Sequence, residues 1–362
     1  MVAANFLSFL PMVIVQVGYA GMNTTSKLAM DSGMKPLVLV AYRLIFATFA
    51  MIPFAYFLEW KTRPKITRPL LFQIFLCSLA GIPGDQVLFF VGLEHSSLTI
   101  STALTNILPA VTFLFAVIFR QEAVGIKRLS GQAKVLGTIL SVGGAMLLTF
   151  YHGPMLNIGE SSIHWKYANN SGDHNPSNNS TSVFGSLIVI ASTISCSIWY
   201  IFQAKVSKVF PAPYTSTLLT CFMGSIECVL IGISVNHKVS DWSLRSPFRL
   251  VAALYAGIVS TALAFGLTTW TIQRKGAVYA SVFSPLLLVV TAILGWALLH
   301  EKIYVGTMVG SLLIVLGLFA VLWGKDRELK PNFGDTEPVK PGNNEEKLEL
   351  ELQLPADSVS DK

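Results

Sequence analysis

Ten apolar blocks, each long enough to form a membrane-crossing helix, limit the folds open to this chain more than any other feature. About 20 apolar residues in a helix cross the ~30 Å hydrocarbon core of a bilayer. Inside lipid the backbone has to satisfy its own hydrogen bonds, and a helix does so within one segment. The sequence therefore predicts an all-α polytopic membrane protein with ten transmembrane helices, at about 6–26, 37–58, 70–93, 98–119, 132–151, 183–203, 214–235, 249–271, 278–299 and 303–323.

The composition agrees with a membrane protein and removes nucleic acid from the candidate partners. Apolar residues make up 52% of the chain and charged residues only 13%, whereas soluble proteins have about 25% charged residues. The net charge of +6 comes with Lys and Arg gathered in the short loops between blocks, as expected where basic loops stay in the cytosol. The first block follows no basic residue and is too long for a signal peptide, so we interpret it as a span.

The distribution of basic residues predicts the orientation. The loops after the even-numbered blocks, together with Lys325, Arg327 and Lys330 at the start of the tail, hold fifteen Lys and Arg residues, and the other side holds seven. Both termini are therefore predicted to be cytosolic. The long outer loop, about 152–182, contains three possible N-glycosylation sites, Asn169, Asn178 and Asn179. The tail, 325–362, is rich in Pro, Glu and Lys and is predicted to be disordered.

The two halves of the chain resemble each other. Four features of the first half recur in the same order in the second half, at offsets between 173 and 179 residues. They are Ala80, Gly81, Ile82 and Phe89 with Ala256, Gly257, Ile258 and Phe265; Glu122 with Glu301; Gly137 and Gly144 with Gly310 and Gly317; and Lys27 and Pro36 with Lys205 and Pro213.

Each half contains five blocks, and this odd number means that the second half enters the membrane from the opposite side. The sequence thus predicts two inverted five-helix repeats, 1–151 and 183–324, joined by the loop 152–182. Inverted repeats are the layout of many secondary transporters, whose substrate site lies near the midplane where the halves meet.

Several strings resemble a known family. They are "AYRLIFA" in block 2, "VGLEHSS" after block 3, "LPAVTFLFAVIFRQE" in block 4, "WYIFQAKVSKVFPAPYTST" in blocks 6–7, and "TIQRKGAVYASVFSPLLLVVTAILG" and "GLFAVLWGK" in blocks 8–10. Their order and spacing resemble the plant drug/metabolite transporters of the EamA type, in the nodulin-like branch related to "walls are thin" proteins that includes the UMAMIT amino-acid facilitators. The resemblance implies ten helices in two five-helix repeats and the movement of small organic solutes.

The stretch "AGIPGDQVLFF" (80–90) breaks its own helix inside an apolar block. Pro83 donates no backbone hydrogen bond and clashes with the preceding turn. Non-helical backbone at this depth is tolerated only against protein or a water-filled cavity. Asp85 and Gln86 could therefore face such a cavity, or Asp85 could be bonded to a neighbouring helix at a packing kink. In the family that the chain resembles, an uncharged polar residue is common at the position of Asp85.

Three ionisable residues fall well inside the blocks, Arg43, Asp85 and Glu227. Each costs about 3 kcal/mol in a membrane unless something offsets the charge. Arg43 could hold a substrate carboxylate or pair with Asp85 or Glu227, and for Glu227 we favour a structural role. If Asp85 faces a poorly hydrated cavity, desolvation disfavours its charge, and it could carry a proton coupled to solute movement.

Helical spacing adds uncharged candidates for the substrate site. Tyr19 and Asn23 share one helix face in block 1, and Trp199 and Gln203 share one in block 6. The two blocks are repeat equivalents, so the pairs could lie opposite each other and offer aromatic walls and amide groups to an amphiphilic solute. Weaker candidates are Asn106 in block 4 and Ser281 and Ser284 in block 9.

The sequence favours a transporter that moves amino acids or related metabolites by alternating access, facilitated or proton-coupled. The alternatives are an intramembrane aspartyl protease and a membrane receptor, but the protease would need a second carboxylate close to Asp85. No cofactor or metal is expected, and the expected partners are a small-molecule solute and the lipid bilayer, with a homo-oligomer left open. The expected location is the plasma membrane, with the vacuolar membrane as the alternative.

Overall fold

The computed structural model describes residues 2–95, 98–122, 125, 128–151, 153–154, 179–235, 237–244, 246–299 and 304–329. By its internal contacts the chain divides into two units, Met1–Lys325 and Asp326–Lys362. All packing between helices is that of the first unit. Asn169 and Asn178 lie outside the described residues, and Asn179 is the first residue of a helix.

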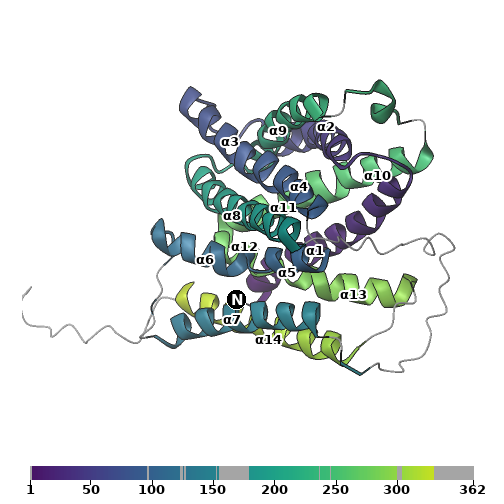
Figure 1. Ribbon diagram of the computed structural model, residues 1–362. Coiled ribbons are helices and arrows are strands. Elements are labelled where there is room, and N and C mark those ends of the chain that lie inside the picture. The colour runs from purple at the N-terminus through teal and green to yellow at the C-terminus, as the bar shows by residue number, and fades with distance from the viewer. Residues whose placement is uncertain are drawn as a thin grey trace, which may run out of the picture. The chain divides into compact units, whose positions relative to one another are not determined.

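The first five predicted spans are all helical (Figure 1). In chain order they are formed by α1 (Val2–Asp31), α2 and the π-helical turn η1 (Pro36–Phe54 and Ala55–Glu59), α3, the π-helical turn η2 and α4 (Arg68–Gly81, Pro83–Val87 and Leu88–Glu94), α5 and α6 (Leu98–Thr105 and Leu108–Ile118), and α7 (Leu129–Phe150).

The second five spans repeat this order. They are formed by α8 (Asn179–Val209), α9 (Pro213–Val235), α10, the π-helical turn η4 and α11 (Pro247–Gly257, Ile258–Leu263 and Ala264–Lys275), α12 and α13 (Ala277–Ser281 and Leu286–Leu299), and α14 (Val305–Leu329). A short 3₁₀ helix, η3 (Val239–Trp242), lies between α9 and α10.

These helices match the predicted membrane spans. Nine helical segments in the described part of the chain are long and apolar enough to cross a membrane, and the apolar part of α1, Phe9–Asn23, is a shorter tenth. Prolines stand in the first turns of α2, α3 and α10, where the missing amide proton costs nothing and the fixed φ favours the helix.

The halves share two irregularities at equivalent places. The third span of each half contains a π-helical turn, η2 or η4, and the fourth span is split before or at a proline, Pro109 or Pro285. The sequence attributes the break in the third span to Pro83. Because η4 has the same wide turn with no proline inside it, Pro83 alone does not account for this turn.

The helices exchange partners between the halves (Figure 1). The sixth span, α8, packs against α3, α4, α5 and α6 of the first half, and the first span, α1, packs against α10, α11 and α13 of the second half. Two groups of spans result, which we call the α8 bundle (α3–α6 and α8) and the α1 bundle (α1 and α10–α13).

The second and seventh spans form a pair of their own, α2 with α9. The carboxylate of Glu59 at the end of η1 fastens this pair, since it accepts the amide protons of Tyr214 at 3.0 Å and Thr215 at 2.6 Å in the first turn of α9. A carboxylate at a helix N-terminus satisfies amide groups that have no partner inside the helix.

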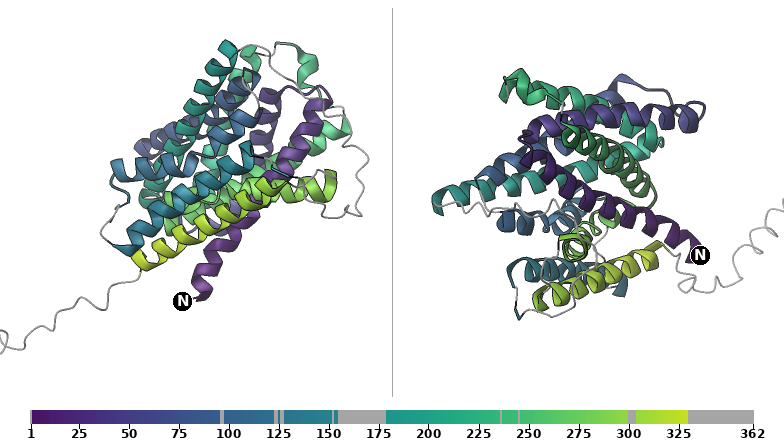
Figure 2. Two further views of the ribbon diagram at one scale, coloured as in Figure 1. Left: turned by 60° about the horizontal axis from the view of Figure 1, so that its bottom comes forward. Right: turned by 90° about the vertical axis from the view of Figure 1, so that its right-hand side faces the viewer.

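The fifth and tenth spans, α7 and α14, form the other pair, which Figure 2 shows side by side. Their backbones touch through glycines: a Cβ added to Gly137 would lie 2.7 Å from the Gly317 carbonyl oxygen, and one on Gly144 2.8 Å from that of Gly310. These are the glycines whose matching spacing indicated the internal repeat. Small residues allow such close helix packing in membranes.

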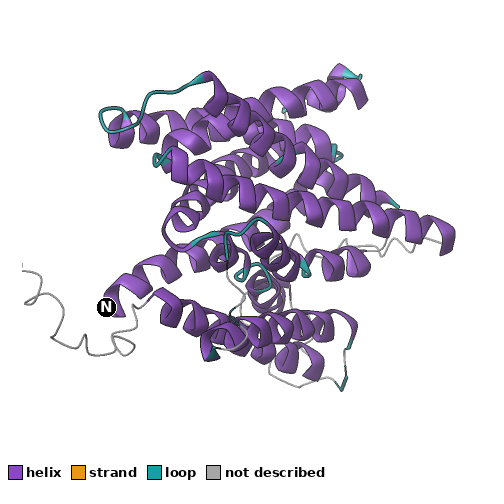
Figure 3. Cartoon of the chain, turned by 90° about the vertical axis from the view of Figure 1, so that its left-hand side faces the viewer, coloured by secondary structure: helices purple, strands orange, loops and turns teal. Residues whose placement is uncertain are grey.

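All regular elements in the described part of the chain are helices (Figure 3), so the predicted all-α polytopic fold is confirmed. The two ends of the bundles are named here by residues that mark them. The Glu122 end is the end where Glu59, Gln121, Lys208, Arg274 and Lys325 lie. The Gly33 end is the opposite end, where the side chain of Arg249 in α10 donates to the Ser32 carbonyl at 2.6 Å.

Candidate functional site

The π-helical turn η2 lies where α8 crosses the third span. Serines of α8 bond carbonyl groups in and beside this turn. Ser195 Oγ donates to the Ala80 carbonyl at 3.0 Å, and Ser192 Oγ lies 2.9 Å from the Asp85 carbonyl, which also accepts the Leu88 amide. The break is therefore satisfied by protein, which is what a membrane interior requires.

The side chain of Asp85 faces α8. Its Oδ1 accepts a hydrogen bond from Ser192 Oγ at 3.0 Å, and the Cys196 thiol also hydrogen-bonds the carboxylate. Asp85 is thus bonded to a neighbouring helix, one of the two arrangements that the sequence left open. The carboxylate lies within electrostatic range of Arg43, but the described residues include no ion pair between the two.

Arg43 of α2 is buried, with 7% of its surface exposed. One guanidinium nitrogen donates to the side-chain oxygen of Gln86 in η2, and the other lies 3.1 Å from the sulfur of Met22 in α1. Its Nε has no hydrogen-bond partner among the described residues. Both neighbours are neutral, so the ion pair with Asp85 or Glu227 that the sequence left as an alternative does not occur within hydrogen-bonding distance here.

Tyr19 and Asn23 differ in exposure although they share a face of α1. Tyr19 is half-buried and packs against a buried apolar cluster formed mainly by side chains of α2 and α9. It is also within electrostatic range of Asp85 and of Cys196 in α8. Asn23, one turn nearer the Gly33 end, is exposed. Tyr19 thus lies within electrostatic range of the sixth span, and the face-to-face arrangement of the two pairs stays a prediction.

Trp199 of α8 lies between the two bundles. Its ring is 5.4 Å from that of Phe265 in α11 and 4.8 Å from that of Tyr200, measured between centroids. A Cβ on Gly81 would collide with the indole, so the glycine allows Trp199 to approach α3. The indole is 5% exposed, and its Nε1 has no hydrogen-bond partner in the described part of the chain.

Gln203 is placed by the structure in the packing between helices. It is 1% exposed. Its oxygen accepts from the Cys77 thiol at 3.3 Å, and its nitrogen donates to the Ser216 hydroxyl, also at 3.3 Å. Because both ends of the amide already have partners, this geometry favours a structural role over solute binding.

The three weaker candidates lie at the breaks of the fourth and ninth spans. Asn106 donates to the Thr102 carbonyl at 2.7 Å, and Ser281 to the Val278 carbonyl at 3.1 Å, both within their own segments. Ser284 hydrogen-bonds Tyr200 of α8. The hydrogen bonds of these three residues thus go to other groups. Contacts and electrostatic range bring together four of the predicted residues, which we call the Arg43 cluster: Tyr19, Arg43, Asp85 and Gln86.

Side chains between the Arg43 cluster and the Glu122 end form an aromatic layer. Its members, which belong to one buried apolar cluster or pack against it, are Phe9, Trp199, Tyr200, Tyr279 and Phe283. The main contacts between the α8 and α1 bundles lie at this level and beyond it, between α8 and α11, α8 and α12, and α6 and α12. The two bundles therefore pack against each other between the Arg43 cluster and the Glu122 end.

Several partners at this site could not be found from the sequence. Ser192, Cys196 and Met22 contact Asp85 or Arg43, and they come from α8 and α1. Single serine, cysteine and methionine side chains in an apolar helix give no signal by themselves. Glu227 does not join the site: one of its oxygens accepts from Ser78 at 3.1 Å, which fits the structural role favoured from the sequence.

A cavity of about 210 Å³ lies at the Glu122 end and not at the Arg43 cluster. Its polar lining is formed by Gln121, Glu122, Lys208, Gln273, Arg274 and Lys325. In the part of the chain that the structure describes, no group of three or more His, Cys, Asp or Glu side chains could hold a metal ion.

Known proteins share both the repeat and most of the length of this chain. Residues 6–150 and 183–323 each match the EamA-like transporter family. A WAT1-related protein of Arabidopsis thaliana is 39% identical over 329 residues, covering 88% of this chain and 81% of that protein. Protein WALLS ARE THIN 1 of the same plant is 38% identical over 323 residues, covering 88% and 83%.

A solved crystal structure has the same fold, with a TM-score of 0.63 at 17% identity over 88% of this chain and 97% of that one. The fold, the twofold family match and the plant relatives agree with one another. A transporter family sets aside the protease and the receptor that the sequence had left as alternatives. The chain belongs to the EamA-like transporter family and is a multi-pass membrane transporter, not an enzyme.

Proposed function

We propose that this transporter moves small organic solutes that carry a carboxylate, such as amino acids or related metabolites, by alternating access between the α8 and α1 bundles. The observation that carries the proposal is the environment of Arg43. Its buried guanidinium contacts neutral Gln86 and Met22, and its Nε has no partner among the described residues.

An isolated cation inside a membrane costs about 3 kcal/mol even on the lenient insertion scale. A solute carboxylate would offset this cost, because the planar guanidinium presents paired N–H donors that match two carboxylate oxygens. Tyr19 lies beside this group, and the indole of Trp199, with its unpartnered Nε1, forms part of the aromatic layer beneath. Together they would bind the apolar part of an amphiphilic solute.

The position of the Arg43 cluster supports alternating access. The cluster contains residues of α1, α2 and η2, with α8 on its far side, and so lies where the exchanged helices of the two repeats meet. Transporters with inverted repeats bind solutes at such a place, and one bundle rocks against the other. Movement of the repeats 1–151 and 183–324 would then open the site alternately toward the Gly33 end and toward the Glu122 end. The charge bias predicts that the Glu122 end is the cytosolic one.

Counterflow in liposomes tests the proposed function. Liposomes that contain the purified protein are preloaded with an unlabelled amino acid and are expected to accumulate the labelled amino acid from outside. Purines, which carry no carboxylate, should give weaker exchange. Protein-free liposomes are the control for leakage. Exchange of purines but of no carboxylate compound would contradict the proposed role of Arg43 while leaving transport itself intact.

We propose that Asp85 determines whether solute movement is coupled to protons. Its carboxylate is bonded to Ser192 and Cys196 beside the Arg43 cluster, and the repeat partner Thr261 cannot titrate. Asp85→Asn keeps the shape and removes the titration. If coupling runs through Asp85, the wild type will respond to the pH of the outer side, and the variant will transport at a rate that no longer depends on it.

The measurement is the initial counterflow rate across a series of external pH values. The matched control is Ser192→Ala, which removes a partner of the carboxylate but leaves its titration in place. An unchanged pH profile with a normal rate in Asp85→Asn would show that Asp85 is a structural hydrogen-bond acceptor and that any coupling lies elsewhere.

A further inference from the structure

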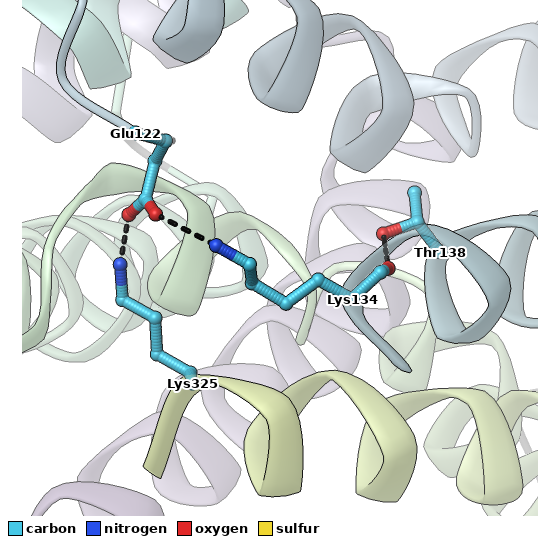
Figure 4. A network of polar contacts seen from close by, with 4 residues as sticks. All are labelled: Glu122, Lys134, Thr138 and Lys325. Atoms are coloured by element: carbon cyan, nitrogen blue, oxygen red, sulfur yellow. Dashed lines mark hydrogen bonds and ion pairs between the residues drawn. The ribbon is translucent and has the colours of Figure 1, made fainter. Parts of the chain in front are cut away.

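A buried ion triad lies at the Glu122 end, outside the candidate substrate site (Figure 4). Glu122 Oε2 is 3.4 Å from Lys134 Nζ, and Glu122 Oε1 pairs with Lys325 Nζ. The side chains of Lys134, Glu122 and Lys325 are 0%, 6% and 11% exposed. One carboxylate thus serves two buried cations, and loss of its charge would leave the two lysines without this shared partner and close to each other.

The triad joins three segments that are far apart in the sequence. Glu122 lies four residues beyond the end of α6 in the α8 bundle, Lys134 is in the second turn of α7, and Lys325 is near the C-terminal end of α14. Glu122 and Lys134 belong to the first half of the chain and Lys325 to the second. The triad therefore holds the α7–α14 pair to the α8 bundle at the Glu122 end.

The backbone after α6 presents Glu122 to its partners. Arg120 has a φ of 55°, a left-handed conformation that is uncommon for a residue with a side chain. The amides of Gln121 and Glu122 both donate to the Ala116 carbonyl, at 2.7 and 3.1 Å, so the chain turns back sharply. The Gln121 side chain also donates to the Ile201 carbonyl of α8 at 3.0 Å, which fixes the turn on the bundle.

The triad borders the cavity of about 210 Å³, and both Glu122 and Lys325 line it. Gly276, at the junction of α11 and α12 in the α1 bundle, also lines it, and a Cβ there would lie 3.6 Å from Glu122 Oε1 and 4.0 Å from Lys325 Nζ. The two bundles and α14 therefore meet at this point. Water entering from the Glu122 end would reach the triad before it reached the aromatic layer.

The triad has no complete equivalent at the aligned positions of the other repeat. The glycine pairs Gly137/Gly310 and Gly144/Gly317 align the fifth and tenth spans at an offset of 173 residues. Glu122 has a counterpart in Glu301, but the positions equivalent to Lys134 and Lys325 are Thr307 and His152. Threonine is neutral, and an ordinary histidine is mostly neutral at pH 7. The two aligned positions in the other repeat thus carry no permanent cation.

We infer that the Glu122–Lys134–Lys325 triad is a clamp, an ion network at one end of the transporter that holds the Glu122 end closed. The resting state of the transporter would then be the state that is open toward the Gly33 end. The inference rests on the proposed alternating access and adds its regulation. Opening the Glu122 end would separate Lys325 from Glu122, and the ion pair has to be broken in every cycle.

Reciprocal cysteine labelling tests the clamp. One reporter is Ala204→Cys, which lines the cavity from α8 and is 6% exposed; the other is Asn23→Cys, which is exposed on α1 near the Gly33 end. A maleimide that cannot cross the membrane labels only cysteines accessible from outside the vesicle. Right-side-out and inside-out vesicles therefore give the labelling rate of each end separately. Parent protein with its four native cysteines gives the background, and a cysteine at Asn332 in the tail identifies the cytosolic side.

Glu122→Gln is expected to speed labelling at position 204 by about tenfold and to slow labelling at position 23, because the two states compete for one population. Lys325→Met is expected to shift both rates in the same directions, and Lys325→Arg, which keeps the charge, to resemble the parent. Lys208→Met is the matched control, since Lys208 lines the same cavity but has no ion pair with Glu122 in the part of the chain that the structure describes.

Opposite changes at the two reporters support the clamp. Faster labelling at both positions would mean that the variant has loosened the fold, and unchanged labelling would mean that the triad has no part in gating; either result overturns the inference. An equal shift in Lys208→Met would also overturn the inference, because any change of charge at the cavity would then change the labelling rates, whether or not it breaks the triad. Labelling needs no solute, so this experiment can fail or succeed independently of counterflow. Failure of the clamp and failure of the proposed function can therefore be distinguished.

Discussion

Arg43→Gln is expected to lower carboxylate transport by about 100-fold, with nearly unchanged yield of folded protein. Glutamine is polar but shorter, and it loses both the charge and the paired donors that would hold a carboxylate. Removing one partner of a buried charged hydrogen-bonded pair costs roughly 2–5 kcal/mol, and 100-fold corresponds to about 2.7 kcal/mol. Arg43→Lys keeps the charge without the fork and should be intermediate.

The measurement is the concentration dependence of counterflow in proteoliposomes, together with elution on size exclusion as a test of folding. Arg249→Gln is the matched control, since Arg249 is a partly buried arginine that bonds backbone and hydroxyl groups of Ser32 and Ser243 at the Gly33 end. It is expected to retain the apparent affinity. If Arg43→Gln misfolds and its soluble fraction transports normally, Arg43 is a packing residue.

Gly317→Val is expected to cost about 3 kcal/mol of stability and most of the folded yield, since overpacking of a well-packed interface typically costs roughly 1–3 kcal/mol, occasionally more. A Cβ at this position would lie 2.5 Å from the Ser141 amide nitrogen and 2.6 Å from the Gly137 carbonyl oxygen. These are backbone atoms of α7 that cannot rotate away, so α7 and α14 would have to separate.

The thermal midpoint in detergent, followed by size exclusion after heating, measures this cost. Gly143→Val is the matched control, because Gly143 is a glycine of the same helix pair whose added Cβ would meet nothing within 4 Å. It should change the midpoint little. Equal losses in the two variants would mean that valine weakens these helices through its propensity, and that the close contact of α7 with α14 has little effect on stability.

The membrane spans could be predicted because their signal is local. A stretch such as 214–235 has to be helical and apolar over the thickness of the bilayer, whatever surrounds it, and the structure has α9 at Pro213–Val235. Boundaries shift where polar residues extend a helix beyond the apolar part. The sixth span was predicted at 183–203, and α8 runs from Asn179 to Val209.

The candidate site was predicted in part. Arg43, Asp85 and Gln86 stood out because a charge, a proline and an amide are costly in an apolar block, and the structure places all three where α2 and the third span approach each other and α8. Gln203 and Trp199 also shared a helix face, but helical spacing gives the direction of a side chain and not its partner. Only the structure shows Gln203 bonded to Cys77 and Ser216.

The fold class, the ten spans and the repeat follow from the sequence alone, since each depends on residues along one helix or on recurrence at a nearly constant offset. Tertiary packing settles which helices meet: α8 joins the third and fourth spans, and α1 joins the eighth and ninth. It also pairs Glu122 with Lys134 and Lys325 and gives η4 its π-helical turn without a proline. The difference arises because the cost of burying a charge or breaking a helix is fixed locally, whereas the group that offsets it comes from a distant segment brought near by packing.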